Sequence, residues 1–402
     1  MIETVQRILS QGFRVFFLAA GLFGAFTGIV WGLWLGIHAA GGMWYDLPFA
    51  MAPHLWHGHE MIFGYATAAL GGFFLTAVPN WTGGPGARTA FITTAAGLWL
   101  IGRAAMWYSV ALPPVLVAVA DLAFIPILAA KIAVQLSRRP KPQNVMFLAF
   151  LALLWVANLM VHLEWIGVTG DTAVAGLRAG LLTLAALIST LGGRITPAFT
   201  RNAMKRAGEP EAAWPATVTS LERAALFLSL LLPLTVMAEL PDAVPGTVAL
   251  VLGIVHAVRL SRWRGGWALR QPILIALHLG FGMLALGMAL WGLAGLGLGS
   301  EVAALHVLGI GAVGGMTLAV MSRAGLGHTG RDLVAPGPVA AAYWLMAAAT
   351  VLRWAGSSGP GAWYFPLMLG AITLWTAAFT LYLVAMWPVL TGPRVDAQAT
   401  QT

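Results

Sequence analysis

The sequence has 402 residues, of which 59% are hydrophobic and 9% are charged, with a formal net charge of +8. Soluble globular proteins carry about 25% charged residues, so this composition excludes an ordinary soluble domain and predicts a protein embedded in the lipid bilayer. Cysteine is absent, which excludes disulfides, thiol catalysis, cysteine-ligated zinc and iron–sulfur clusters. The excess of basic residues fits a membrane face, and we expect no nucleic-acid partner.

Apolar runs of about 20 residues, separated by Pro, Gly or charge clusters, predict about twelve transmembrane helices. The expected spans lie near 14–37, 58–78, 90–109, 113–134, 145–168, 173–194, 220–239, 244–260, 272–295, 301–322, 336–354 and 363–388. The first run has no clear cleavage site, so we interpret it as a span and not as a signal peptide. The fold class is an all-α membrane bundle: a single transmembrane domain over 1–402 with a basic loop at about 195–219 and a polar tail from about 393 to 402.

The basic residues test this count of spans. An even number of spans places both termini on one side of the membrane. With the N-terminus inside, all but three of the 22 Lys and Arg residues fall on the inner side, the exceptions being Arg103, Arg178 and Arg353. The positive-inside rule therefore predicts that both termini are cytoplasmic.

The second, sixth and tenth expected spans each carry a Gly-Gly pair that is followed within a few residues by threonine. The pairs and their threonines are Gly71-Gly72 with Thr76, Gly192-Gly193 with Thr196, and Gly314-Gly315 with Thr317. Small residues let membrane helices approach closely, and 48 glycines make such pairs common. The alternative interpretation is a pseudo-threefold repeat, three sets of four helices, in which three similar helices line a cavity.

The nine histidines fall into two sets by their expected depth in the membrane. The outer set is His38, His54, His57, His59, His162 and His306, and the inner set is His256, His278 and His328. Neutral imidazole is a good ligand for haem iron or copper, and an ionisable group within a span indicates function. For one buried histidine, a hydrogen bond to a neighbouring helix is the ordinary explanation. An outer cluster drawn from three helices instead favours haem or metal binding.

Two neighbouring patterns limit what this cluster can be. His57 and His59 are two residues apart, so on a regular helix they point about 200° apart and cannot bind one metal from one face. Either they serve different centres, or His57 lies in the loop and bends back. The spacing His-Glu-x-x-His of zinc hydrolases is missing. Glu60 and Glu164 each follow a histidine closely, and their carboxylates either orient an imidazole, relay protons or lie at the membrane interface.

Several blocks, in order along nearly the whole chain, resemble the NnrS family. They are the run from His54 to Gly64, Thr76 to Gly83, Asn158 to His162, Gly193 to Pro197, Leu277 to Gly280, and Met316 to Arg323 followed by Gly327 to Arg331. The resemblance implies a bacterial inner-membrane protein that contains haem and copper and acts in nitric oxide metabolism, denitrification and nitrosative stress defence.

A more distant resemblance is to subunit I of the haem–copper oxidases. His57 is followed by Met61, Ile62 and Phe63 and then by Gly71-Gly72-Phe73, while His306 precedes Gly311-Ala312-Val313. This resemblance implies that His57 and His306 hold a low-spin b-type haem near the outer face. Ala304 stands where that superfamily has a second histidine, so the usual oxygen-reducing centre is absent, and copper or a second haem needs other ligands.

The remaining histidines supply those ligands in the predicted site. His59 and His162 are the outer candidates for haem or copper, and His278, His256 and His328 are the inner candidates for a metal. Arg353 and Arg103 break the positive-inside pattern, and either a haem propionate or ordinary interfacial placement explains them.

Three functions agree with these features. The first is a haem and copper protein that binds or reduces nitric oxide, with quinol as a candidate electron donor. The second is a transporter or channel for copper or a small anion, favoured by Asp121 within a span and by Gly- and Pro-interrupted helices. The third is a haem protein without turnover that protects cellular iron from nitrosylation or serves in assembly. The sequence leaves open whether the protein is an enzyme.

Overall fold

The computed structural model describes residues 2–395, apart from the side chain of Pro142, and every regular element in that part of the chain is a helix. The helices of the N-terminal half are α1 (Ile2–Ile8), α2 (Gly12–Ala39), α3 (Pro53–His59), η1 (Glu60–Tyr65), α4 (Ala66–Thr82), α5 (Thr89–Trp107), α6 (Pro114–Leu122), α7 (Phe124–Leu136), α8 (Pro142–Trp165) and α9 (Thr172–Arg206). Those that follow are η2 (Glu211–Ala213), α10 (Thr219–Met237), α11 (Ala243–Ser261), α12 (Gly265–Ala268), α13 (Pro272–Gly295), α14 (Glu301–His306), η3 (Val307–Gly314), α15 (Gly315–His328), α16 (Gly337–Ser358), η4 (Gly361–Trp363) and α17 (Tyr364–Thr391).

Twelve helical segments of the described chain are long and apolar enough to cross a membrane, which confirms the predicted number. Two expected boundaries are wrong. The sixth span continues through Pro197 to Arg206, so the first part of the expected loop at 195–219 is helical. His328 is the last residue of α15 and does not lie in the following loop. Proline is tolerated within membrane helices when neighbouring groups satisfy the backbone, which explains why Pro197 does not end α9.

The packing of the chain divides it into two compact units. Unit 1 takes in the chain up to Gly180, Met321–Leu333 and the chain from Phe379 onward, and unit 2 takes in Leu181–Val320 and Val334–Ala378. Both units consist of helices. The single transmembrane domain stays a prediction, and most of the polar tail expected after residue 393 lies outside the described residues.

In unit 1, α4 packs against α2 and α7, and α8 packs against α6 and α7. Gly71 and Gly72 of α4 allow the contact with α2, because a Cβ atom at Gly72 would lie 2.6 Å from the ring of Phe17. This is the close-approach role of small residues in membrane helices. The pseudo-threefold repeat stays a prediction.

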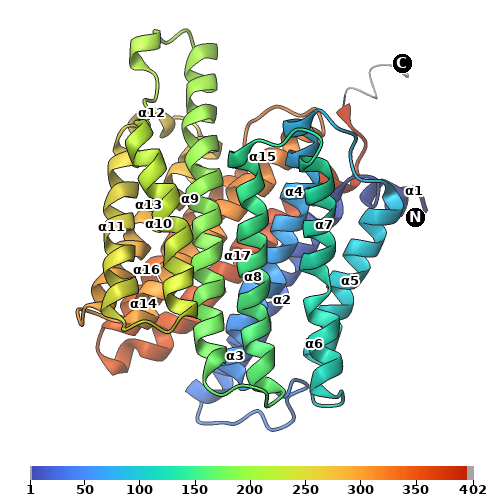
Figure 1. Cartoon of the computed structure of the whole chain (residues 1–402), viewed down its shortest axis with the longest axis vertical. Coiled ribbons are helices and arrows are strands. Elements are labelled where there is room, and N and C mark those ends of the chain that lie inside the picture. The colour runs from blue at the N-terminus through green and yellow to red at the C-terminus, as the bar shows by residue number, and fades with distance from the viewer. Residues whose placement is uncertain (1, 396–402) are drawn as a thin grey trace. The chain divides into compact units, whose positions relative to one another are not determined.

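In unit 2, α11 and α13 form the closest helix pair, and Figure 1 shows them side by side. Glycines on both helices bring the two backbones together. A Cβ atom at Gly253 would lie 2.7 Å from the backbone nitrogen of Ala289, and one at Gly246 would lie 3.0 Å from the carbonyl oxygen of Gly292. The interface is therefore built by backbone contact, as expected where lipid removes the hydrophobic driving force between helices.

The beginning and the end of the described chain meet within unit 1. Arg14 at the start of α2 donates hydrogen bonds to the carbonyl oxygens of Leu390, at 2.7 Å, and Gly392, at 2.8 Å. Arg7 donates to the carbonyl oxygen of Thr391 at 3.1 Å. The start of the first span and the end of the last span thus lie on the same side, as an even number of spans requires.

Candidate metal centre

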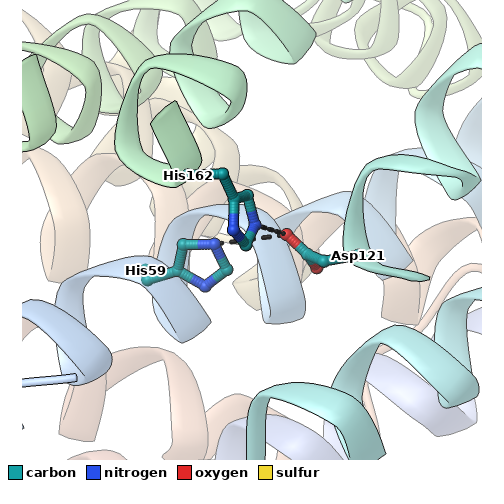
Figure 2. A group of neighbouring side chains, drawn as sticks. All are labelled: His59, Asp121 and His162. Atoms are coloured by element: carbon teal, nitrogen blue, oxygen red, sulfur yellow. Dashed lines mark hydrogen bonds and ion pairs between the residues drawn. The ribbon is translucent and has the colours of Figure 1, made fainter. Parts of the chain in front are cut away.

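Three helices of unit 1 bring His59, Asp121 and His162 together. Figure 2 shows the two imidazoles and the carboxylate pointing toward one another. His162 Nε2 lies 2.8 Å from Asp121 Oδ2, and His59 Nε2 lies 3.3 Å from the same oxygen. One ligand atom from each residue lies within 4.8 Å of the other two, and all three residues are buried. Two imidazole nitrogens and a carboxylate oxygen form a donor set that suits copper, zinc or non-haem iron.

Local sequence explains where Asp121 lies. Pro126 has no backbone N–H, so the carbonyl group of Leu122 lacks its helical donor and the span breaks between α6 and α7 at Ala123. The indole of Trp155 on α8 donates to that carbonyl at 3.1 Å. This hydrogen bond links α8 to the end of α6 at the break. Asp121, the residue before Leu122, therefore lies beside His162 on α8.

A second layer of buried polar residues holds the three candidate ligands. Asn158, one turn before His162, donates from Nδ2 to Asp121 Oδ2 at 2.7 Å, and its Oδ1 lies 2.9 Å from His59 Nε2. Arg103 on α5 donates to Glu60 Oε1 at 2.6 Å and also pairs with Asp121 Oδ1. Ligand-orienting partners of this kind are typical of metal sites.

The acceptors around the two imidazoles indicate where their ring hydrogens can lie. His59 Nδ1 lies 2.8 Å from Glu60 Oε1, and its Nε2 faces the amide oxygen of Asn158, so both nitrogens of His59 face acceptors. His162 donates from Nε2 to Asp121, which leaves the lone pair on Nδ1. Among the described residues, this buried Nδ1 atom has no hydrogen-bond partner. The imidazole of His162 is therefore oriented by a carboxylate and keeps an open lone pair.

The π-helical segment η1 begins directly after His59 and carries Glu60. π-Turns inside α-helices occur often at functional sites, because the extra residue changes the direction of the side chains around it. Gly64 in η1 leaves room for the arginine, since a Cβ atom there would lie 2.9 Å from Arg103 Nη1. The indole of Trp99 donates to the carbonyl oxygen of Gly64 at 3.0 Å, which satisfies a backbone acceptor within the segment.

His57 and His59 point to different partners, as their spacing predicted. His57 lies on the helix α3 and not in a loop, and its ring stacks on Trp31 with 4.5 Å between centroids. His306 is at the end of α14, and its Nδ1 donates to the carbonyl oxygen of Val302 at 2.7 Å. The second π-helical segment, η3, begins directly after His306, and η1 begins three residues after His57. Both histidines predicted to hold haem therefore lie shortly before a π-helical segment. Their joint role as haem ligands stays a prediction.

The inner histidines of unit 2 each have a partner of their own. His256 Nδ1 lies 3.2 Å from Arg259 Nη1, and because arginine only donates, the ring hydrogen of neutral His256 must be on Nε2. Arg259 in turn pairs with both oxygens of Glu222, at 2.9 and 2.5 Å. His278 Nε2 lies 2.9 Å from Thr200 Oγ1, whose hydroxyl also donates to the carbonyl oxygen of Thr196.

Among the other predicted site residues, His328 and Arg353 each have partners of their own. His328 lines a cavity of about 250 Å³ together with Gln11, Asn80 and other residues of unit 1, and its ring packs against Phe13. Arg353 donates to Ser357 on the same helix. Arg103 differs from these two, because its guanidinium belongs to the network around Asp121 and Glu60.

Two residues of the centre were not predicted from the sequence as part of a site. Asp121 counted only toward the transport alternative, although an acidic residue within a span was the signal that could have identified it. Asn158 stood only within a block shared with the family, and its spacing of four residues from His162 places both on one helix face. Glu60 orients the imidazole of His59, which is one of the alternatives that the sequence left open. Glu164 instead accepts from the backbone nitrogen of Ala173 at 2.5 Å.

The comparisons with known proteins agree with the resemblance found in the sequence. No curated protein matches the chain. The family model of the NnrS protein matches residues 7–394. Because this match covers nearly the whole sequence, the chain belongs to the NnrS family.

Proposed function

We propose that this protein binds copper and haem in the bacterial inner membrane and binds nitric oxide there, as part of nitric oxide metabolism and nitrosative stress defence. The observation that carries the proposal is the convergence of His59, Asp121 and His162, three buried ligands from three helices of one unit. Family membership supports the link to nitric oxide. The excess of basic residues on one side supports cytoplasmic termini.

His59, Asp121 and His162 fit copper. Imidazole nitrogens suit copper, and Glu60 orients the His59 ring through Nδ1, which leaves Nε2 for the metal. Nε2 of His59 and Nε2 of His162 both lie within 3.3 Å of Asp121 Oδ2, so the three groups face one position. Bound copper would supply a position that takes up nitric oxide. The chain itself excludes bulk water from that position, because both histidines are 0% exposed.

A b-type haem is the second proposed cofactor, with His57 and His306 as its axial ligands. The absence of cysteine supports a non-covalent haem, since c-type attachment needs two cysteines. The bond from His306 Nδ1 to Val302 supports a ligand role, because a backbone carbonyl that accepts from one ring nitrogen orients the imidazole. The distant likeness of the second span to haem–copper oxidases supports His57, and Arg353 is the proposed partner for a propionate.

The experiment is a measurement of metal and haem in protein purified in detergent. We expect copper in the wild type, loss of copper in His162→Ala, and loss of the b-type optical spectrum in His57→Ala and His306→Ala. His38→Ala is the matched control, because His38 bonds only the carbonyl oxygen of Trp34 among the contacts of its ring nitrogens. Copper retained in His162→Ala would contradict the proposed copper centre.

An optical shift on addition of nitric oxide tests whether the protein binds this ligand, and turnover of nitric oxide with a reductant tests catalysis.

A transporter of copper is the second candidate, because Glu60, Arg103 and Asp121 are charged residues buried within spans. Proteoliposomes with wild type and His162→Ala separate the two functions. Uptake of copper that depends on His162 would favour transport. Tightly held copper without uptake would favour a resident cofactor.

A further inference from the structure

The charges around the candidate centre are unequal. Glu60 and Asp121 are two buried carboxylates, and Arg103 is the single guanidinium that pairs with both of them. Their exposed fractions are 1%, 4% and 6%. With both histidines neutral, the network carries one negative charge within a membrane-spanning part of the chain.

No further charge of the chain offsets this excess in the contacts recorded for these residues. The ion pairs of Glu60 and Asp121 are with His59, His162 and Arg103 only, in the described part of the chain. A net charge buried away from water is expensive, and its cost grows with the square of the charge. The network therefore favours one added unit of positive charge over none or two.

The hydrogen-bond geometry agrees with this count. Both nitrogens of His59 face acceptors, whereas a neutral imidazole carries one hydrogen, so one of the two acceptors lies beside a bare ring nitrogen where a cation fits. A monovalent metal ion bound at Nε2 makes the network neutral. A divalent ion leaves it with one positive charge.

We infer that the His59–Asp121–His162 centre selects a monovalent ion, which for copper is the cuprous state, through the charge set by Glu60, Asp121 and Arg103. This inference rests on the proposed function, since it assumes a metal at this centre. It assigns Arg103 and Glu60 as residues that set metal selectivity without binding the metal. The bound copper is then held more strongly as Cu(I) than as Cu(II).

The test compares silver(I), a redox-inert monovalent probe, with zinc(II) under anaerobic conditions by competition against chelators of known affinity. Arg103→Gln changes the network from one negative charge to two. We expect the ratio of Ag(I) to Zn(II) affinity to fall on the order of a hundredfold, because one unit charge a few ångströms away acts more strongly on a divalent ion. For copper, a hundredfold change corresponds to a reduction potential lower by about 120 mV.

The matched control is Arg103→Gln with Glu60→Gln, which removes one charge of each sign and restores one negative charge. We expect this double variant to return the affinity ratio to within a few fold of the wild type. Asn158→Asp is a second route to two negative charges and keeps Arg103 if Arg103→Gln fails to fold. It should lower the ratio in the same direction.

The outcomes separate the inference from the proposed function. A ratio of Ag(I) to Zn(II) affinity that changes with the net charge of the network in every variant supports the inferred preference for a monovalent ion. Metal binding in the wild type with a ratio that is unchanged in Arg103→Gln, or not restored in the double variant, overturns the selectivity and leaves the metal centre standing. Binding of neither probe by the wild type removes the centre itself.

Discussion

The two units bury similar residues in different arrangements. In unit 1, His59 and His162 converge on one carboxylate, Asp121, whose charge is shared with Arg103. In unit 2, Arg259 forms an ion pair with Glu222, and His256 and His278 bond separate partners. Buried histidines therefore do not by themselves make a candidate metal site. In unit 1 it is the carboxylate of Asp121 that brings the two imidazoles together.

The largest expected effect is that of Asp121→Ala, which removes this carboxylate. Arg103 loses one of its two partners and His162 loses its orienting acceptor. Breaking a buried ion pair costs about 3–5 kcal/mol, so we expect a loss of that size in unfolding free energy together with loss of copper. Thermal unfolding in detergent and metal analysis measure both. Asp46→Ala, in a loop outside the network, is the control, and copper retained in Asp121→Ala would contradict the account.

Gly64 in unit 1 and Gly193 in unit 2 allow the two units to be compared by a second pair of variants. A Cβ atom at Gly64 would approach Arg103 Nη1 to 2.9 Å and Phe23 to 2.6 Å, and one at Gly193 would clash with the guanidinium of Arg259. Overpacking of this kind costs about 1–3 kcal/mol, so both alanine variants should be destabilised. Only Gly64→Ala should weaken copper binding.

Gly97→Ala is the reference for both glycine variants, since a Cβ atom there has no neighbour within 4 Å among the described residues. Equal loss of copper in the two crowded variants would mean that the units do not differ in the way described.

A smaller effect is expected for Glu222→Gln in unit 2. The side chain of Glu222 is 32% exposed, so water replaces part of its bond to Arg259, and we expect a loss of about 1–2 kcal/mol in unfolding free energy. Copper content should stay at the wild-type level. A fall in copper would show that the two polar networks are coupled.

The smallest effect is expected for His278→Gln, which removes the hydrogen bond to Thr200. A single neutral hydrogen bond contributes about 1 kcal/mol, and we expect a change of that size without loss of copper. This variant also tests His278 as a metal ligand, one of the three inner candidates predicted from the sequence together with His256 and His328. Copper lost on this substitution would place the metal in unit 2.

The fold could be predicted from the sequence because the bilayer fixes the length of each apolar run and the charges of the loops fix the parity. The site was predictable only in part. His59 and His162 were selected by residue type and depth, but a linear sequence does not show which acidic residue meets them. Asp121 reaches them through the break that Pro126 causes. The π-turn after His59 was not predicted, because the residues Glu60–Tyr65 read like those of a regular membrane helix.

Copper binding by His59, Asp121 and His162 can be tested with an X-ray absorption spectrum at the copper edge of the loaded protein, because methionine is the only source of sulfur in a chain without cysteine. We expect an edge typical of Cu(I), with two imidazole ligands, an oxygen neighbour and no sulfur. A sulfur atom bound to the copper would place the metal at methionines and would rule out the proposed ligands.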